Sequence, residues 1–92
     1  MAVIRDEGHK RDLVLRLKRI EGQLRGVQAM IESGAECEQV TQQLSAARRA
    51  LEKAFFNVLA CAIQAGPEKP VGEKPVVAER VRHAAALLAK FG

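Results

Sequence analysis

Apolar residues recur along this chain in alternating steps of four and three positions, the pattern of helices that pack along one stripe. In the first half of the chain the stripe consists of Leu13, Leu17, Ile20, Leu24, Val27 and Ile31. Gly34 follows it as a helix C-cap would. Gly22 and Gly26 lie inside it, and because each costs a helix roughly 1 kcal/mol relative to alanine, a close approach by a neighbouring helix would explain both. The pattern predicts a long first helix that ends before Gly34.

A second stripe of the same kind predicts a longer helix. It consists of Cys37, Val40, Leu44, Ala47, Leu51, Ala54, Val58 and Cys61. The dipeptide Gly66-Pro67 ends this helix, and the segment GPEKPVGEKP, which holds all three prolines, predicts a linker. A third, shorter helix is predicted by one more apolar face, made of Val77, Val81, Ala84, Leu88 and Phe91.

No strand-like alternation appears, so we expect an all-α fold in a single domain, residues 1–92: two long antiparallel helices and a short third. A second helix of about 29 residues would be roughly 43 Å long. One partner helix and a short third helix do not cover that length within a monomer. We therefore expect two chains to pair their hairpins into a four-helix bundle.

Composition favours an aliphatic, self-associating helical protein of the cytoplasm. Hydrophobic residues make up 48% of the chain, with three Phe and no Trp or Tyr. The first residues are charged and carry no apolar signal region, and no apolar run reaches the roughly 18 residues of a membrane span. With only two cysteines, we expect reduced thiols in a reducing cytosol rather than a structural disulfide.

The two cysteines are the main candidates for chemistry. Cys37 and Cys61 are 24 positions apart on one predicted helix, hence roughly 36 Å apart, and do not meet within one chain. If two second helices pair antiparallel about a dyad near Arg49, Cys37 of one chain faces Cys61 of the other. Such a pair suits redox exchange, electrophile capture or binding of Cu(I). The alternative is that both are small buried hydrophobic residues.

Catalysis has little support in the residue pattern. His9 and His83 are the only histidines; we expect His83 at the surface and His9 in a charged N-terminus. The chain has no Ser/His/Asp constellation, no phosphate-cradling loop and no spaced carboxylate pair. We therefore predict that it is not an enzyme.

Basic residues crowd the two long helices, and the net charge is +4. The candidate DNA-contacting residues are Arg16, Arg19, Arg48, Arg49 and Lys53. In an antiparallel hairpin they come level with one another and form a surface suited to duplex phosphates. The alternative is an ordinary solvated face. No helix-turn-helix, zinc-finger or β-ribbon signature is present.

The segments RLKRIEGQLRGVQAMIESGAEC and VTQQLSAARRAL resemble the copper-sensing/nickel-sensing repressor family, the CsoR/RcnR family, and the similarity extends over essentially the whole chain. The resemblance implies an all-helical homodimer that assembles as a dimer of dimers. It also implies binding to operator DNA and release when an inducer occupies a site between subunits. By that resemblance Cys37 is the sensor cysteine, and Arg16 and Lys53 contact DNA.

The chain departs from the family's metal site. Metal-sensing members have His at the position of Ala62, Cys or His at that of Gly66, and in some cases His at that of Arg5. Persulfide-responsive members place a second thiol where Gly66 stands here. Cys61 lies one position before the expected histidine, about 100° away around a helix, and so does not replace it.

Our leading hypothesis is a repressor without a metal cofactor, in which Cys37 and Cys61 of paired chains sense a thiol-reactive species. A cross-link between them would favour a bundle geometry that no longer fits DNA. One alternative is a repressor that binds Cu(I) between the same two thiolates. A second, from another class, is a structural or adaptor bundle with inert cysteines.

Overall fold

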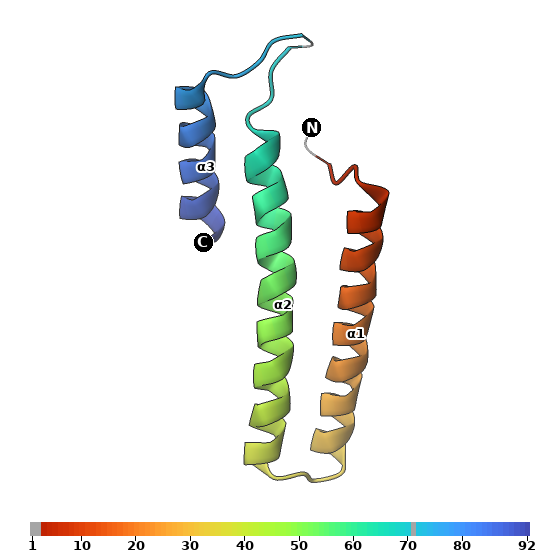
Figure 1. Ribbon diagram of the computed structural model, residues 1–92. Helices are drawn as coiled ribbons and strands as arrows, with labels where there is room; N and C mark the ends of the chain where they lie inside the picture. The colour runs from red at the N-terminus through yellow and green to blue at the C-terminus, as the bar shows by residue number, and fades with distance from the viewer. Residues whose placement is uncertain (1–2, 71) are drawn as a thin grey trace. The chain divides into compact units, whose positions relative to one another are not determined.

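The computed structural model describes residues 3–70 and 72–92, which form three helices: α1 (Glu7–Glu32), α2 (Cys37–Ala65) and α3 (Val77–Phe91) (Figure 1). No strand occurs among the described residues, and the predicted all-α fold is confirmed. None of the helices in these residues is long and apolar enough to cross a membrane. The chain divides into two compact units, one of Arg5–Phe56 and one of Asn57–Gly92 with the N-terminal residues.

The first helix begins six residues before the first residue of its apolar stripe. Asp6 is its N-cap, with extended backbone angles, and the Asp6 Oδ1 accepts a hydrogen bond from the backbone N–H of His9 at 2.8 Å. Such a cap satisfies one of the four N–H groups that a helix start leaves unpaired. The helix therefore includes the charged segment in which we expected His9. The start of the helix had one signal in the sequence: Asp6 is a residue type that caps helix N-termini.

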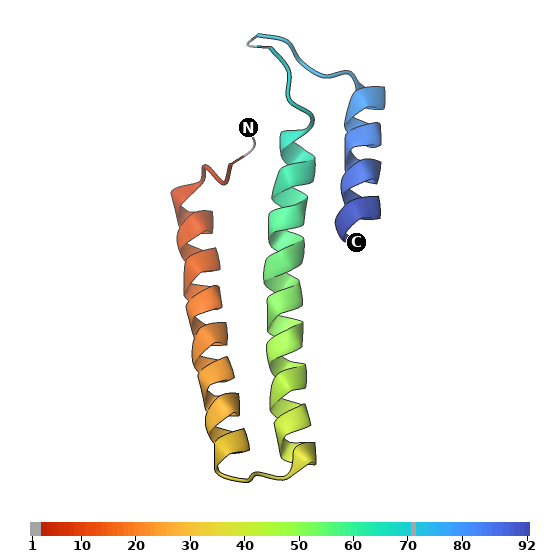
Figure 2. The ribbon, with the colours of Figure 1, turned by 180° about the vertical axis from the view of Figure 1, so that it is seen from behind.

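A tight turn joins α1 to α2, as Gly34 predicted. The Ala35 N–H donates to the Met30 carbonyl at 2.9 Å, and the Gly34 N–H donates to that of Ile31 at 3.2 Å. Gly34 has a φ of 80°, in the left-handed region that glycine enters without steric cost. Within the unit Arg5–Phe56, α1 and the first part of α2 consequently lie antiparallel and side by side (Figures 1 and 2).

Each apolar stripe divides into two rows, and only one row is buried. The buried residues of the unit Arg5–Phe56 are Leu13, Ile20 and Val27 of α1 and Ala47 and Ala54 of α2, each no more than 5% exposed. The other row, which we call the apolar row, is 39–59% exposed and consists of Leu17, Leu24, Ile31, Leu44 and Leu51. Half of the predicted seam therefore packs within the hairpin, and half is open.

Gly22 and Gly26, the two interior glycines of α1, do not contact the backbone of another element among the described residues. A Cβ at Gly26 would meet nothing within 4 Å, and one at Gly22 would meet only the Arg25 side chain, with Nη2 at 3.7 Å. The close approach that we expected as their explanation is absent from the described residues.

The second unit joins the end of α2 to α3. Gly66, with a φ of 72°, ends α2, and the Arg80 Nη2 donates to the Gln64 carbonyl at 2.9 Å. The Lys69 Nζ lies 2.6 Å from the Glu79 Oε2. Most of the predicted apolar face of α3 is exposed, namely Val77, Val81, Leu88 and Phe91. Polar contacts therefore hold the start of α3 near the end of α2.

Two matched glycine substitutions should change stability in opposite directions. Gly26→Ala should raise the free energy of unfolding by roughly 1 kcal/mol, because an open helical site accepts a methyl group and gains helix propensity. Gly66→Ala should lower it by roughly 1 kcal/mol, because an L-residue is strained at positive φ. Urea denaturation followed by circular dichroism measures both. A loss of stability in Gly26→Ala would contradict an open site.

Candidate functional site

A groove between α1 and α2 gathers most of the predicted DNA-contacting residues. It has a volume of about 480 Å³ and is lined by Arg16, Arg19, Ile20, Gln23, Ala46, Arg49, Ala50 and Lys53. We call it the basic groove, because four of its eight lining residues are cations and none is acidic. All eight belong to the unit Arg5–Phe56.

Regular helix geometry explains the basic groove. The lining positions are 16, 19, 20 and 23 on α1 and 46, 49, 50 and 53 on α2, so each helix contributes residues i, i+3, i+4 and i+7. Residues with this spacing share one face of a helix. Ala46 and Ala50 are short, so α2 leaves the groove open between the long cationic side chains. An antiparallel hairpin brings the two faces together along its length.

The basic groove and the apolar row lie on opposite sides of the hairpin. About the axis of α1, Leu24 lies about 40° from buried Ile20 in one direction, and Gln23 lies about 60° from it in the other. About the axis of α2, Leu51 lies about 40° from buried Ala47 in the first direction, and Ala50 lies about 60° from it in the other. Because the two helices are antiparallel, the same sense of rotation points to the same side of the hairpin. A partner covering the apolar row would therefore leave the basic groove accessible.

Arg48 is the one predicted DNA-contacting residue that does not line the basic groove. It lines a separate shallow depression with Thr41, Leu44 and Ser45. Within residues 3–70 and 72–92, none of the four cations of the basic groove has an ion-pair or hydrogen-bond partner. Their charges are available to an external anion.

Three residues that line the basic groove, Gln23, Ala46 and Ala50, were not among the candidates from the sequence. Their i, i+3, i+4, i+7 spacing with the cations could have indicated them, because residues so spaced share one face of a helix.

The two cysteines lie on different rows of α2. Cys37 is the first residue of the helix and is exposed, and its carbonyl accepts a hydrogen bond from the Thr41 Oγ1 at 2.8 Å. At seven-residue spacing it continues the exposed row of Leu44 and Leu51. Cys61 is half-buried, in the last turns of the helix, and follows Ala54 on the buried row. Both thiols are free, and Cys37 is exposed in the single chain.

A single chain does not assemble a metal site from the residues that the structure describes. They contain no group of three or more His, Cys, Asp or Glu side chains placed to hold a metal ion. A Cβ on Gly66 would stand 3.6 Å from the Arg80 Nη1, so a guanidinium lies beside the position at which the family resemblance led us to look for a ligand. His83, which we expected at the surface, is half-buried on α3.

Residues 9–90 match the protein family described as "Metal-sensitive transcriptional repressor". A match over this much of the sequence shows that the chain belongs to that family. The family resemblance read from the helical motifs is thereby confirmed. Because the family consists of transcriptional repressors, the expectation that the chain is not an enzyme is also confirmed.

Individual relatives match about half of the chain. The copper-sensing transcriptional repressor CsoR of Bacillus subtilis (strain 168) is 40% identical over 50 residues, which are 54% of this chain and 50% of the relative. The copper-sensing transcriptional repressor RicR of Mycobacterium tuberculosis is 46% identical over 44 residues, 48% of this chain and 46% of the relative. An uncharacterized protein from Serratia marcescens is 38% identical over 50 residues, 54% of this chain and 55% of the relative. The chain thus spans about half the length of the curated relatives it matches.

Proposed function

We propose that the chain is a transcriptional repressor that binds operator DNA through the basic groove. The observation that carries this proposal is a groove without a lining carboxylate whose four cations, Arg16, Arg19, Arg49 and Lys53, have no partner among the described residues. Phosphate contacts from Lys and Arg supply most of the affinity of such surfaces and release bound counterions. The sequence carries no helix-turn-helix, zinc-finger or β-ribbon signature, so the proposal assigns the groove phosphate contacts rather than base readout.

We further propose that two chains pair through the apolar row, and that such dimers assemble in pairs. Five large apolar side chains on one face of the hairpin favour a second copy as their cover, because a four-helix bundle buries a/d positions of all four helices. Pairing on this side leaves the basic groove of each chain facing outward. Two grooves related by a dyad would then contact symmetry-related phosphates of one operator.

The proposed inducer is a thiol-reactive species that links Cys37 to Cys61 of the partner subunit. Cys37 continues the apolar row and would lie at the edge of the proposed dimer interface. A persulfide supplies both oxidising equivalents: the two thiols form a disulfide, while the inducer's sulfurs leave as a thiol and H₂S. The linked dimer would be held in a geometry that fits DNA less well.

Cu(I) is the alternative inducer. Two of the relatives are named as copper-sensing, and two thiolates from different chains are soft donors of the type that selects Cu(I). The rest of the family's site does not fit, since Ala62 and Gly66 offer no ligand and the Arg80 guanidinium lies beside Gly66. A third possibility, a structural or adaptor bundle with inert cysteines, predicts no salt-dependent shift of DNA from upstream of the chain's own gene.

The assembly is tested by mass. Light scattering at micromolar concentration should return about two or four times the chain mass of 10.0 kDa, because the apolar row is covered by a second copy. Leu51→Glu should lower the mass by placing a charge in the row. Leu15→Glu, a change at an exposed apolar position outside the row, is the control and should not dissociate the dimer. A parent protein that remains at the chain mass refutes the assembly.

DNA binding through the basic groove is tested by two neutralising substitutions. Arg16→Ala and Lys53→Ala should each weaken binding to the upstream duplex by about 1 kcal/mol, or roughly fivefold, with helicity unchanged. The slope of log K against log salt should fall by about 0.9 for each phosphate that the variant no longer neutralises. Lys74→Ala removes the same charge from the exposed linker and should leave both quantities unchanged. If Arg16→Ala and Lys53→Ala both bind as the parent does, the proposed interface is wrong.

A further inference from the structure

A second groove runs along α2 beside the basic groove and shares one residue with it. It has a volume of about 450 Å³ and is lined by Glu38, Thr41, Gln42, Ser45 and Arg49. We call it the polar groove. Arg49 lines both grooves, so the two surfaces are continuous through its side chain. Both grooves belong to the unit Arg5–Phe56.

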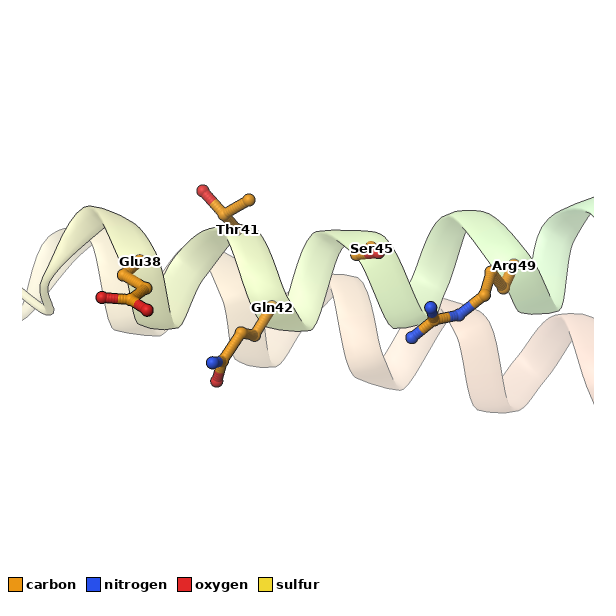
Figure 3. A pocket seen from close by; sticks show the side chains of 5 residues that line it. All are labelled: Glu38, Thr41, Gln42, Ser45 and Arg49. Carbon is orange, nitrogen blue, oxygen red and sulfur yellow. The ribbon is translucent and has the colours of Figure 1, made fainter.

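The side chains of the polar groove follow one face of the helix. Glu38, Gln42, Ser45 and Arg49 are separated by steps of four, three and four residues, and Lys53 follows after another four. Figure 3 shows the Arg49 guanidinium extended back toward the N-terminal end of α2, with the Gln42 amide and the Glu38 carboxylate on the same side of the helix. Lys53 and Gln42 are separated by about 16 Å of helix, several times the roughly 3.4 Å of duplex axis per phosphate on one strand.

Along the polar groove, from Arg49 toward the start of α2, the side chains change in character. The cationic donor Arg49 is followed by the neutral donors Ser45 and Gln42 and then by a carboxylate. The Gln42 amide has two N–H donors, and the Ser45 hydroxyl has one. Neither side chain has a hydrogen-bond partner among the described residues. Thr41 is different, because its hydroxyl already donates to the Cys37 carbonyl at 2.8 Å. Beyond Gln42, the Glu38 carboxylate repels a phosphate.

We propose that the DNA backbone continues from the basic groove across Arg49 onto Gln42 and Ser45, and that Glu38 marks the end of this path. The proposal rests on the proposed function and extends it to two neutral donors and one boundary residue. Gln and Ser side chains are ordinary phosphate-contacting groups that fix the position of a protein on the duplex. They release no counterions of their own, which separates their effect from that of the cations.

Salt-dependent fluorescence anisotropy on the upstream duplex, and on a random duplex of equal length, tests the proposal. The variant Gln42→Ala/Ser45→Ala should bind both duplexes about fivefold to tenfold more weakly, with the parent's slope of log K against log salt. Glu38→Gln should bind several-fold more tightly at low salt. Gln64→Ala and Glu73→Gln make the corresponding changes in the other unit and should bind as the parent does. Far-UV circular dichroism and light scattering verify the helicity and mass of every variant.

The possible outcomes separate this proposal from the proposed function. If Lys53→Ala weakens binding while the Gln42/Ser45 double variant and Glu38→Gln match the parent, the path along the polar groove is wrong and the basic groove stands. If Lys53→Ala and Arg16→Ala also match the parent, the proposed function itself fails. If the double variant instead lowers the mass of the assembly, the polar groove is an interface between copies of the chain, and the proposal is overturned.

Discussion

The packing of one apolar row of α1 against small residues of α2 sets the position of both candidate functional surfaces of the hairpin. Leu13, Ile20 and Val27 are buried, as are Ala47 and Ala54. Large side chains against alanines allow two helices to approach closely and fix their rotation about their own axes. Once that rotation is set, the positions on either side of the buried row cannot be exchanged. The cations of the basic groove fall on one side, and the residues of the apolar row fall on the other.

This division gives the two faces different physical roles. Burying the apolar row against a second copy would stabilise the dimer by roughly 25 cal/mol for each Å² of apolar surface removed from water, and this contribution requires no charge. The basic groove, in contrast, keeps like charges close together, which disfavours the free protein and favours a polyanion. A dimer built on the first face would leave the second face free for the proposed contact with DNA. The two proposals support each other because each uses the face that the other leaves free.

Much of the fold follows from the sequence, because helical periodicity, Gly34 and the Gly66-Pro67 stop are local signals. The start of α1 was less visible, since the Asp6 cap precedes the apolar stripe. The site was only partly predictable. The charges of Arg16 and Lys53 are evident in the sequence, but which half of a stripe is buried depends on the rotation of the packed helices. For the same reason, the sequence could not reveal that Cys37 is exposed or that Arg48 lies outside the basic groove.

Cys37 and Cys61 lie on different rows of α2, so the two thiols differ in their exposure to solvent. Cys37 follows the exposed row at the start of the helix, whereas Cys61 follows the buried row near its end. The last turn of α2, just after Cys61, is also held by Arg80, whose guanidinium donates to the Gln64 carbonyl. A cross-link at Cys61 would therefore act on a turn that is tied to α3. Such a link changes DNA affinity only if it fits one assembly geometry better than the other.

The most direct measurement compares operator affinity at fixed salt before and after treatment with a persulfide, with peptide mapping of the products. The account predicts a Cys37–Cys61 link between chains, a loss of at least about tenfold in affinity, equivalent to about 1.4 kcal/mol, and recovery on reduction. Cys37→Ala and Cys61→Ala should form no such link and keep their affinity. A treated protein in which mapping finds the link but DNA binding is unchanged would contradict the account.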